Sequence, residues 1–364
     1  MILFPTDYSS TLDRIKNIDP IRYAKTRNFI DGDVSYLSPY ISRGVISVQR
    51  VKEAVLKKGY KPYQIEKFLQ ELAWREYFQR VWQAKGTSAI NTALKQEQTD
   101  LSHMQMINSV EGASTGIEAI DEQINKLYHT GYMHNHTRMY TASIVCNIGK
   151  AHWHQPSKWM YYHLLDGDLA SNNCSWQWVA AAFSSKKYYC NQENINKYCN
   201  SYQRNTFLDK SYEEIPELKI PEVLEQTVTL SLSTELPKAD VIKIDPSKPV
   251  LIYNSYNLDS NWRKEEDANR ILLLEPLHFS QYPVSKKVLQ FIVDLSKNIN
   301  DIQLFVGEFD ELLQLTGNAP IVSKEHPAFE YYSGTKDNRD WMFPQVTGYY
   351  NSFFSFWKKC EKYL

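Results

Sequence analysis

Apolar residues recur at helical spacing through much of the first 210 positions. In segment 62–82, the apolar positions that share one helix face are Ile65, Phe68, Leu69 and Leu72. Segments 130–153 and 157–168 are further helical candidates, and short stretches with Gly, Ser and Pro separate them. The pattern therefore predicts that this part of the chain is helical.

The pattern changes after about Asn205. Residues 211–246 are rich in proline and acidic side chains, and we expect an extended linker there. Three short apolar runs follow, at 249–254, 270–276 and 301–308, and a helical pattern at 285–299 lies between the last two. This order predicts parallel strands in a small α/β domain at 247–364. Its aromatic-rich tail, from Trp341 onward, is expected to be a helix packed back on either domain.

Composition and charge narrow the class of protein. The chain has 364 residues, which suggests roughly two domains, and it holds five scattered cysteines and no C-x-x-C pair. No segment is apolar for the length of a membrane span, and the start of the chain does not resemble a signal peptide, so we expect a soluble cytoplasmic protein. Residues 1–210 carry 25 Lys and Arg against 19 Asp and Glu. This surplus is compatible with a polyanionic partner or with solubility alone.

One short segment concentrates polar side chains beside indoles. Its sequence, LLDGDLASNNCSWQW, runs from Leu164 to Trp178 and contains Asp166, Asp168 and Asn172. The two acids could bind a divalent cation, but no glycine-rich phosphate loop accompanies them. Acids, amides and indoles together are more typical of a flavin-type redox site.

Two helical segments place further polar groups on single faces. Glu71 precedes Arg75 by four residues, so the two lie on one helix face. This order and spacing would equally suit an ion pair on the surface of the helix. Asn135, Arg138 and Met139 share a face of another predicted helix. Six of the nine histidines lie between positions 129 and 163, but H-x-H on a helix directs the imidazoles to different faces. We therefore predict no metal site.

These segments together resemble the FAD-binding domain of the cryptochrome/photolyase family, over about residues 20–190. GDVSYLSPYISRGVIS (32–47) is similar to the family's phosphate loop, and ELAWREYF (71–78) to its W-R-E helix. TGYMHNHTRMYTAS (130–143) and the segment 164–178 resemble its two flavin-facing segments. The resemblance implies a photolyase-like α-helical FAD-binding domain at 1–210, the linker at 211–246 and a smaller α/β domain at 247–364.

The resemblance also implies FAD as the cofactor, folded back on itself within the helices. Tyr23, Ser35, Leu37 and Ser38 would surround its pyrophosphate, and Arg75 would face the phosphate side. Arg138 and Asp166 would form a charge pair beside the ring, Asp168 would accept a hydrogen bond from the ring edge, and Asn172 would lie opposite N5. The remaining cofactor-binding positions are Phe68 and Tyr132, where the family has tryptophans.

The implied reaction is light-driven repair of cyclobutane pyrimidine dimers in DNA, in which excited, reduced FAD lends one electron to the dimer. Trp74 would stack on the flipped dimer and Glu71 would stabilise its radical anion, while Asn135 and Met139 would line the cavity. The cavity pair Asn135 and Met139 is typical of enzymes that repair cyclobutane dimers rather than (6-4) products. Trp176 and Trp153 match the proximal and middle members of the photoreduction chain.

Several positions depart from the family pattern. The distal tryptophan of the photoreduction chain is replaced by Val110. Trp159, Tyr161 or Tyr162 could take its place. The family's α/β antenna domain normally comes before the flavin domain, whereas here an α/β segment follows it, so we expect either a rearranged domain order or an unrelated appended domain. Three functions remain open: a dimer photolyase, a cryptochrome-like photoreceptor or redox flavoprotein without repair activity, and a nucleic-acid-binding protein that retains FAD structurally.

Overall fold

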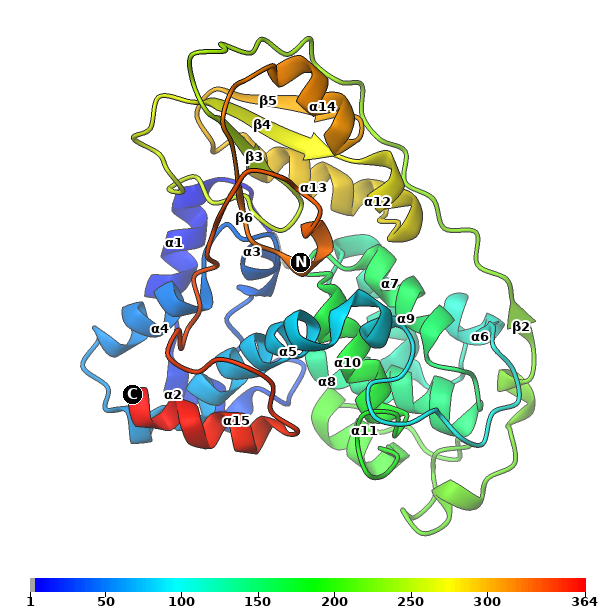
Figure 1. The fold of residues 1–364 in the computed structure, drawn as a ribbon. Helices are drawn as coiled ribbons and strands as arrows, with labels where there is room; N and C mark the ends of the chain where they lie inside the picture. Colours follow the sequence, from blue (N-terminus) through cyan, green and yellow to red (C-terminus); the bar gives the residue numbers. More distant parts are fainter. Residues whose placement is uncertain (1–3) are drawn as a thin grey trace.

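The computed structural model describes residues 4–364, and its first half is built from helices joined by short loops (Figure 1). These helices are α1 (Tyr8–Lys16), α2 (Pro20–Thr26), α3 (Ser38–Ser42), α4 (Val48–Leu56), α5 (Glu66–Asn91), α6 (Asn108–Glu111), α7 (Glu118–Thr130), α8 (Asn135–Ser143), α9 (His154–His163), α10 (Leu169–Val179) and α11 (Gln192–Cys199). Helix α5 packs against α2, α4 and α10 and kinks at Gly86, where φ is 79°. Nowhere in residues 4–364 is a helix both long and apolar enough to cross a membrane.

The helices that carry the predicted polar segments are shorter than the apolar pattern suggested. Helix α8 continues as a π-helical turn at Ile144–Ile148 and ends before Gly149. Helix α7 ends at Gly131, whose φ of 72° favours glycine. A Cβ atom there would lie 2.6 Å from Cγ of Leu165, so glycine also allows the loop with Asp166 to approach α8 closely.

The linker predicted at 211–246 has little regular structure. Strand β2 (Thr227–Val228) pairs antiparallel with β1 (Met106–Ile107) in the helical half. The chain then runs along the edge of the parallel sheet described below, where Asp240 N–H donates to the Leu304 carbonyl at 3.0 Å. The division of the chain into two domains with a linker at 211–246 stays a prediction.

A five-stranded parallel sheet follows, in the order β5-β4-β3-β6-β7. Its strands are β3 (Val250–Tyr253), β4 (Asn269–Leu274), β5 (Ile302–Val306), β6 (Ile321–Lys324) and β7 (Thr335–Asp337), and its helices are α12 (Pro276–Gln281), α13 (Lys286–Ser296) and α14 (Phe309–Thr316). The parallel pairing and the first three strands confirm the sequence prediction. Strands β6 and β7 were missed because they are short and partly polar. Because the first strand lies at the centre, the carboxyl ends of β3 and β6 border the crevice of a doubly wound sheet.

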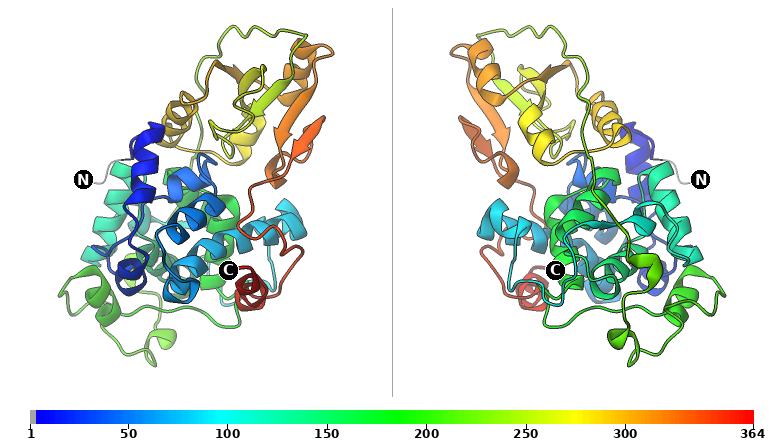
Figure 2. Two further views of the ribbon diagram at one scale, coloured as in Figure 1. Left: turned by 90° about the vertical axis from the view of Figure 1, so that its left-hand side faces the viewer. Right: turned by 90° about the vertical axis from the view of Figure 1, so that its right-hand side faces the viewer.

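The sheet and the helices share one apolar core. It joins residues of α4 and α5 to residues of β3, β4 and α13. Leu258 N–H donates to the Arg43 carbonyl at 2.9 Å, and a Cβ atom on Gly44 would lie 2.3 Å from the Tyr256 carbonyl oxygen. Two views from opposite sides, each turned by 90° from Figure 1, show the sheet at one end of the helical part (Figure 2). Residues of the sheet therefore reach the helices that carry the predicted site.

The aromatic tail returns to α5. Residues 341–352 are not helical, and the last α-helix, α15 (Phe353–Cys360), lies along the helical half (Figure 1). Trp357 Nε1 donates to Glu66 Oε1 at 3.1 Å, and the Phe356 ring lies 5.8 Å from the Tyr77 ring. The predicted tail helix thus forms only in its second half, and it packs on the N-terminal side of α5.

Candidate functional site

The first predicted pair forms a partly buried ion pair. Arg138 Nη2 donates to both carboxylate oxygens of Asp166, at 3.0 and 2.9 Å. Arg138 Nε donates to the Met133 carbonyl at 2.8 Å, which fixes the guanidinium, and the guanidinium lies 5.6 Å from the Tyr132 ring centroid. The side chains of Arg138 and Asp166 are 20% and 6% exposed. Helix α8 and the loop before α10 thus place a fixed positive charge next to an aromatic ring.

The second acid, Asp168, is the N-cap of α10. Its Oδ1 accepts from Ser171 N–H at 2.8 Å, a contact that satisfies a free amide of the first helical turn. Its Oδ2 accepts from Gln79 Nε2 at 2.6 Å and from Arg75 Nη2 at 3.3 Å. The side chain is fully buried. Asp168 is therefore an oriented carboxylate in a site of low dielectric.

The side-chain amide of Asn172 is held through its Nδ2 atom. Its Nδ2 donates to the Ser157 carbonyl and to Asn173 Oδ1, both at 3.0 Å. Asn173 in turn donates to Asn91 Oδ1 at 2.9 Å. Because both N–H groups of Asn172 have protein acceptors, its Oδ1 is the atom left for a ligand.

Aromatic rings surround these polar groups. Tyr23 and Phe68 meet edge to face at 5.1 Å, and Tyr132 meets Tyr36 at 5.4 Å. Burial raises the pKa of Tyr23 and of Tyr132, so both phenols stay neutral at neutral pH. Tyr36 has a φ of 52°, which is rare for a residue with a Cβ atom and marks a strained loop.

The strained loop and the start of α3 contain three of the four residues predicted to surround a pyrophosphate; the fourth, Tyr23, lies on α2. Leu37 is buried, whereas Ser35 and Ser38 are half-buried, and Ser38 begins α3. Arg75 Nη1 donates to Ser42 Oγ at 3.1 Å, so this arginine joins α3 to Asp168. The pyrophosphate role of these residues stays a prediction.

The predicted substrate residues are less well assembled. Glu71 faces Arg27 Nε at 3.2 Å and Lys67 Nζ at 3.1 Å. The Trp74 ring stacks on Phe353 of α15, with ring centroids 3.8 Å apart and planes 10° apart. In the described part of the chain, no hydrogen bond or ring contact joins Asn135 or Met139 to these two side chains. Asn135 is exposed and Met139 is half-buried.

The two predicted electron-transfer tryptophans are buried. Trp176 lies on α10 with 2% of its surface exposed, and Trp153 precedes α9 with none exposed. Trp153 Nε1 is buried without a hydrogen-bond partner. Of the substitutes considered for the distal position, Trp159 donates from Nε1 to the Tyr128 hydroxyl at 2.9 Å. Tyr128 is half-buried and was not singled out from sequence.

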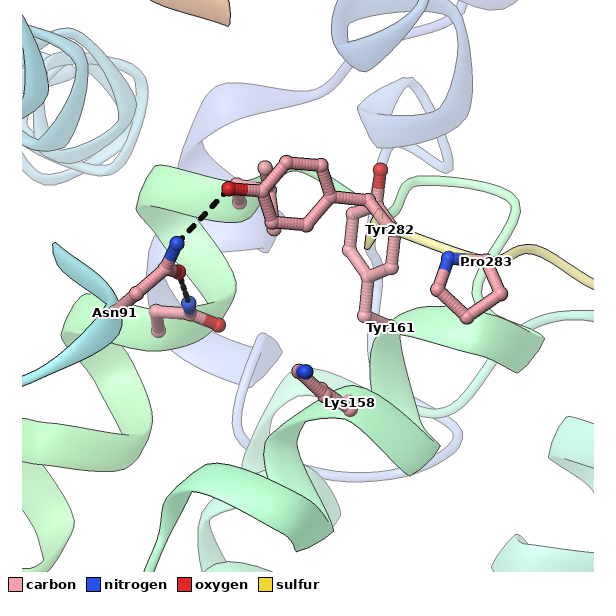
Figure 3. A pocket seen from close by; sticks show the side chains of 7 residues that line it. Asn91, Lys158, Tyr161, Tyr282 and Pro283 are labelled. Carbon is pink, nitrogen blue, oxygen red and sulfur yellow. Dashed lines mark hydrogen bonds between the residues drawn. The ribbon is translucent and has the colours of Figure 1, made fainter. Parts of the chain in front are cut away.

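Two hollows lie where the helices meet the sheet. The larger is a cleft lined in part by Arg75, Gln79, Asn257 and Arg339. The smaller is lined in part by Asn91, which donates to the Tyr282 hydroxyl at 2.9 Å (Figure 3). Both hollows therefore border hydrogen bonds that lead to Asp168 or Asn172.

Several side chains at the site were missed from sequence. Gln79 lies four residues after Arg75 on the same helix face, so helical spacing could have identified it. Arg339 and Phe353 lie far along the chain from α5, and no local pattern links them to it. Arg339 Nη1 donates to Gln79 Oε1 at 2.6 Å. The sheet-bearing half thus contributes to the site through residues outside its regular elements.

Comparison with known proteins identifies the domain family that the central part of the chain matches. Residues 68–232 match the family described as the FAD binding domain of DNA photolyase. The matched region includes Phe68, Arg75 and the two segments with Arg138 and Asp168. The groups present also fit such a cofactor, because a guanidinium, two carboxylates and a free amide oxygen can bind the polar edge of a flavin and aromatic rings can cover its faces.

The relatives are photolyases. The chain is 26% identical over 264 residues to the deoxyribodipyrimidine photo-lyase of Buchnera aphidicola subsp. Acyrthosiphon pisum, which covers 69% of this chain and 53% of the relative. It is 30% identical over 200 residues to that of Alkalihalophilus pseudofirmus, covering 54% of this chain and 41% of the relative. A cryptochrome structure from Synechocystis is 22% identical, with a TM-score of 0.49 and coverage of 54% of this chain and 44% of that chain.

Residues 68–232 thus match a photolyase-type FAD-binding domain, which supports the cryptochrome/photolyase family for this chain, and its cofactor is FAD. Both predictions from sequence are thereby confirmed. The matches span about half the length of the curated relatives. The helical part and the parallel sheet are likewise confirmed.

Proposed function

We propose that this protein is a light-dependent FAD flavoprotein that splits cyclobutane pyrimidine dimers in DNA. The observation that carries the proposal is the assembly of one ion pair, Arg138 with Asp166, beside the capped and hydrogen-bonded carboxylate of Asp168. When bound, FAD supplies a light-absorbing ring that can give and take back one electron. The relatives named as photo-lyases support the choice of DNA as the partner.

In this proposal the chain's own residues bind and orient. Arg138 keeps a positive charge at the ring because Asp166 and the Met133 carbonyl hold its guanidinium. Asp168 offers a carboxylate oxygen that can accept an N–H group from the ring edge. The rings of Tyr23, Phe68 and Tyr132 exclude water, which strengthens these electrostatic contacts.

On the substrate side, Glu71 is the group most ready for its proposed role. Its side chain is 26% exposed, and it is already paired with two cations. Glu71 can therefore hydrogen-bond a base that enters from solvent. Asn135 and Met139 would line the same cavity.

The test is a repair assay under blue light. The purified protein, with its flavin chemically reduced, is mixed with an oligonucleotide that contains one thymine dimer, and restored thymines are measured. Light-dependent restoration is expected, with a dark sample as the control. A protein that binds FAD and photoreduces normally but restores no thymines would refute the repair function.

A second candidate is a cryptochrome-like photoreceptor or redox flavoprotein without repair activity. The specific observation in its favour is the stack of Phe353 on Trp74, which covers one face of the proposed base platform. No specific observation favours the third possibility, a nucleic-acid-binding protein that retains FAD structurally. Normal photoreduction without repair is the result that this second candidate predicts.

A further inference from the structure

A single side chain connects the buried carboxylate of Asp168 to the sheet-bearing half. Gln79 Nε2 donates to Asp168 Oδ2 at 2.6 Å, and Gln79 Oε1 accepts from Arg339 Nη1 at 2.6 Å. Gln79 is 6% exposed on α5, and Arg339 follows strand β7. The three residues form a continuous hydrogen-bonded chain across the junction of the two halves.

The two ends of this chain fix the orientation of the amide. An ionised carboxylate only accepts hydrogen bonds and a guanidinium only donates them, so the Gln79 amide can satisfy both partners in one orientation alone. In that orientation its dipole lies between a cation and an anion. Hydrogen bonds with charged partners are roughly twice as strong as neutral ones, and a shared amide lets each strengthen the other.

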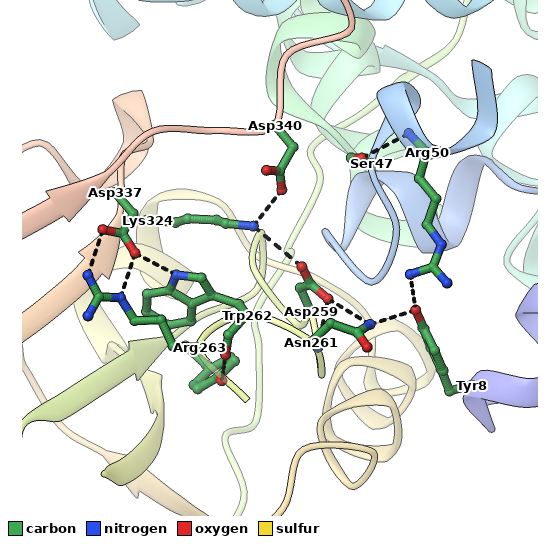
Figure 4. Close-up of polar contacts among 11 residues, drawn as sticks. Tyr8, Ser47, Arg50, Asp259, Asn261, Trp262, Arg263, Lys324, Asp337 and Asp340 are labelled. Atoms are coloured by element: carbon green, nitrogen blue, oxygen red, sulfur yellow. Dashed lines mark hydrogen bonds and ion pairs between the residues drawn. The ribbon is translucent and has the colours of Figure 1, made fainter. Parts of the chain in front are cut away.

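Arg339 is itself held firmly. Its Nε donates to Glu325 Oε2 at 2.8 Å. Before Arg339 in the sequence, Asp337 accepts hydrogen bonds from Arg263 and the Trp262 indole. After it, Asp340 forms an ion pair with Lys324 at 2.7 Å (Figure 4). The backbone that carries Arg339 is therefore anchored at both of its flanks, and the guanidinium can act as a fixed donor.

The charge balance around Asp168 depends on this anchor. Within the described chain, the Asp168 side chain receives hydrogen bonds from Ser171 N–H, from Arg75 at the longer distance of 3.3 Å, and from Gln79 at 2.6 Å. The shortest contact is thus the one that leads to Arg339. Loss of Arg339 would leave Gln79 Oε1 without this charged donor and would remove the positive charge that polarises the amide toward Asp168.

We propose that Gln79 and Arg339 are positioning residues that hold Asp168 oriented and electrostatically balanced, so that the segment after β7 sets the affinity and the reduction potential of FAD. The proposal rests on the assignment of Asp168 to the flavin edge. Removing the relay concentrates negative charge at that edge. Reduction adds electrons to the flavin, so the potential is expected to fall.

The experiment uses the full-length protein with FAD. Gln79→Leu, Arg339→Met and the double variant are compared for FAD dissociation constant, flavin midpoint potential and thermal unfolding. Each single change should weaken FAD binding by on the order of tenfold and lower the potential, and the double variant should add little to either single change. Additive effects, or an unchanged potential, would overturn the proposal.

A matched control separates this role from general stability. Asn269, at the start of β4 in the same half of the protein, is 8% exposed, and its amide accepts from Asp245 N–H and donates to the Asp245 carbonyl, both at 2.9 Å. These partners belong to the linker and not to the relay or its anchors. Asn269→Leu should lower the unfolding temperature and leave the flavin potential unchanged; a shift of the potential equal to that of Gln79→Leu would refute the relay. If Arg339→Met does not fold, Gln79→Glu carries the test, because it keeps the contact with Arg339 and opposes two carboxylates, and an unchanged potential in it would also refute the relay. FAD affinity, flavin potential and unfolding temperature can all be measured without repair activity. A protein that does not repair dimers can therefore still confirm or refute the relay.

Discussion

The ring of Phe353 lies flat against the ring of Trp74, with centroids 3.8 Å apart and planes 10° apart. Phe353 is 2% exposed, and the neighbouring side chains Phe356 and Trp357 of α15 are equally buried. Full burial of such a side chain contributes about 1.5–3 kcal/mol. Helix α15 is thus firmly docked, and a base that stacks on this face of Trp74 must displace Phe353.

Removal of the Phe353 ring should therefore expose the proposed platform. We expect Phe353→Ala to lower the free energy of unfolding by about 3–5 kcal/mol and to tighten binding of a dimer-containing oligonucleotide. Denaturant unfolding and fluorescence anisotropy measure the two effects. Phe354→Ala is the matched control, because Phe354 is 68% exposed and its loss should change the stability by less than about 0.5 kcal/mol. Weaker or unchanged binding in Phe353→Ala would show that this face of Trp74 does not receive the substrate.

The flavin side of the site could be predicted from sequence because its residues are local. Asp166, Asp168 and Asn172 lie within seven positions, and a helix N-terminus brings them to one place. The pairing of Arg138 with Asp166, 28 positions away, came instead from the family resemblance. Local sequence therefore places the three side chains of the segment 164–178 near one another but does not by itself place Arg138 beside them.

The contacts that the sheet-bearing half and the tail make with the site could not be predicted in the same way. The cover on Trp74 comes from Phe353, and the relay to Asp168 comes from Arg339; both lie more than 150 positions away from their partners. Their placement depends on tertiary packing of a non-helical segment, residues 338–352, for which no periodic pattern exists. The short strands β6 and β7 escaped prediction because three or four partly polar residues do not form a recognisable strand pattern.

The ion pair of Arg138 and Asp166 should be required for both folding stability and FAD binding. Arg138→Gln leaves a carboxylate that is 6% exposed without its cation, and we expect a loss on the order of 3 kcal/mol in the unfolding free energy of the FAD-free protein. FAD affinity should fall as well. Adding Asp166→Asn should restore part of the stability but not the FAD affinity. Urea unfolding and FAD titration measure the two quantities. Equal recovery of stability and of FAD affinity in the double variant would show that the ion pair is not part of the flavin site.

Glu71 offers a test that is specific to repair. Because its ion pairs with Arg27 and Lys67 are partly exposed, Glu71→Gln should cost less than about 1 kcal/mol of stability. FAD content should stay the same, whereas light-driven repair should slow roughly tenfold to a hundredfold, as expected for loss of one hydrogen bond from a charged group. Single-turnover repair of chemically reduced protein measures this. An unchanged repair rate would exclude Glu71 from the substrate cavity.

Trp153 can be replaced without breaking a hydrogen bond, since its Nε1 has no partner. Trp153→Phe should impair photoreduction of oxidised FAD while leaving intact the repair that starts from chemically reduced flavin. Absorption changes under blue light report the first quantity, and the thymine assay reports the second. Trp178→Phe, at a tryptophan that is 38% exposed, is the control. Equal loss of photoreduction and repair would refute the electron-transfer role.

Stability should fall in mild acid through His134. Burial lowers the pKa of His134 from 6.5 to about 4, and the side chain is the N-cap of α8, with Nδ1 accepting from His136 N–H. The unfolded chain takes up this proton near pH 6.5 and the folded chain does so only near pH 4, so the contribution is complete above pH 6.5 and is lost as the pH falls to 4. The loss is roughly 3 kcal/mol. His134→Asn keeps a capping group but cannot titrate, so its unfolding free energy should depend less steeply on pH between 6.5 and 4. Parallel urea unfolding curves at several pH values measure this slope, and identical slopes in the two proteins would show that His134 does not control it.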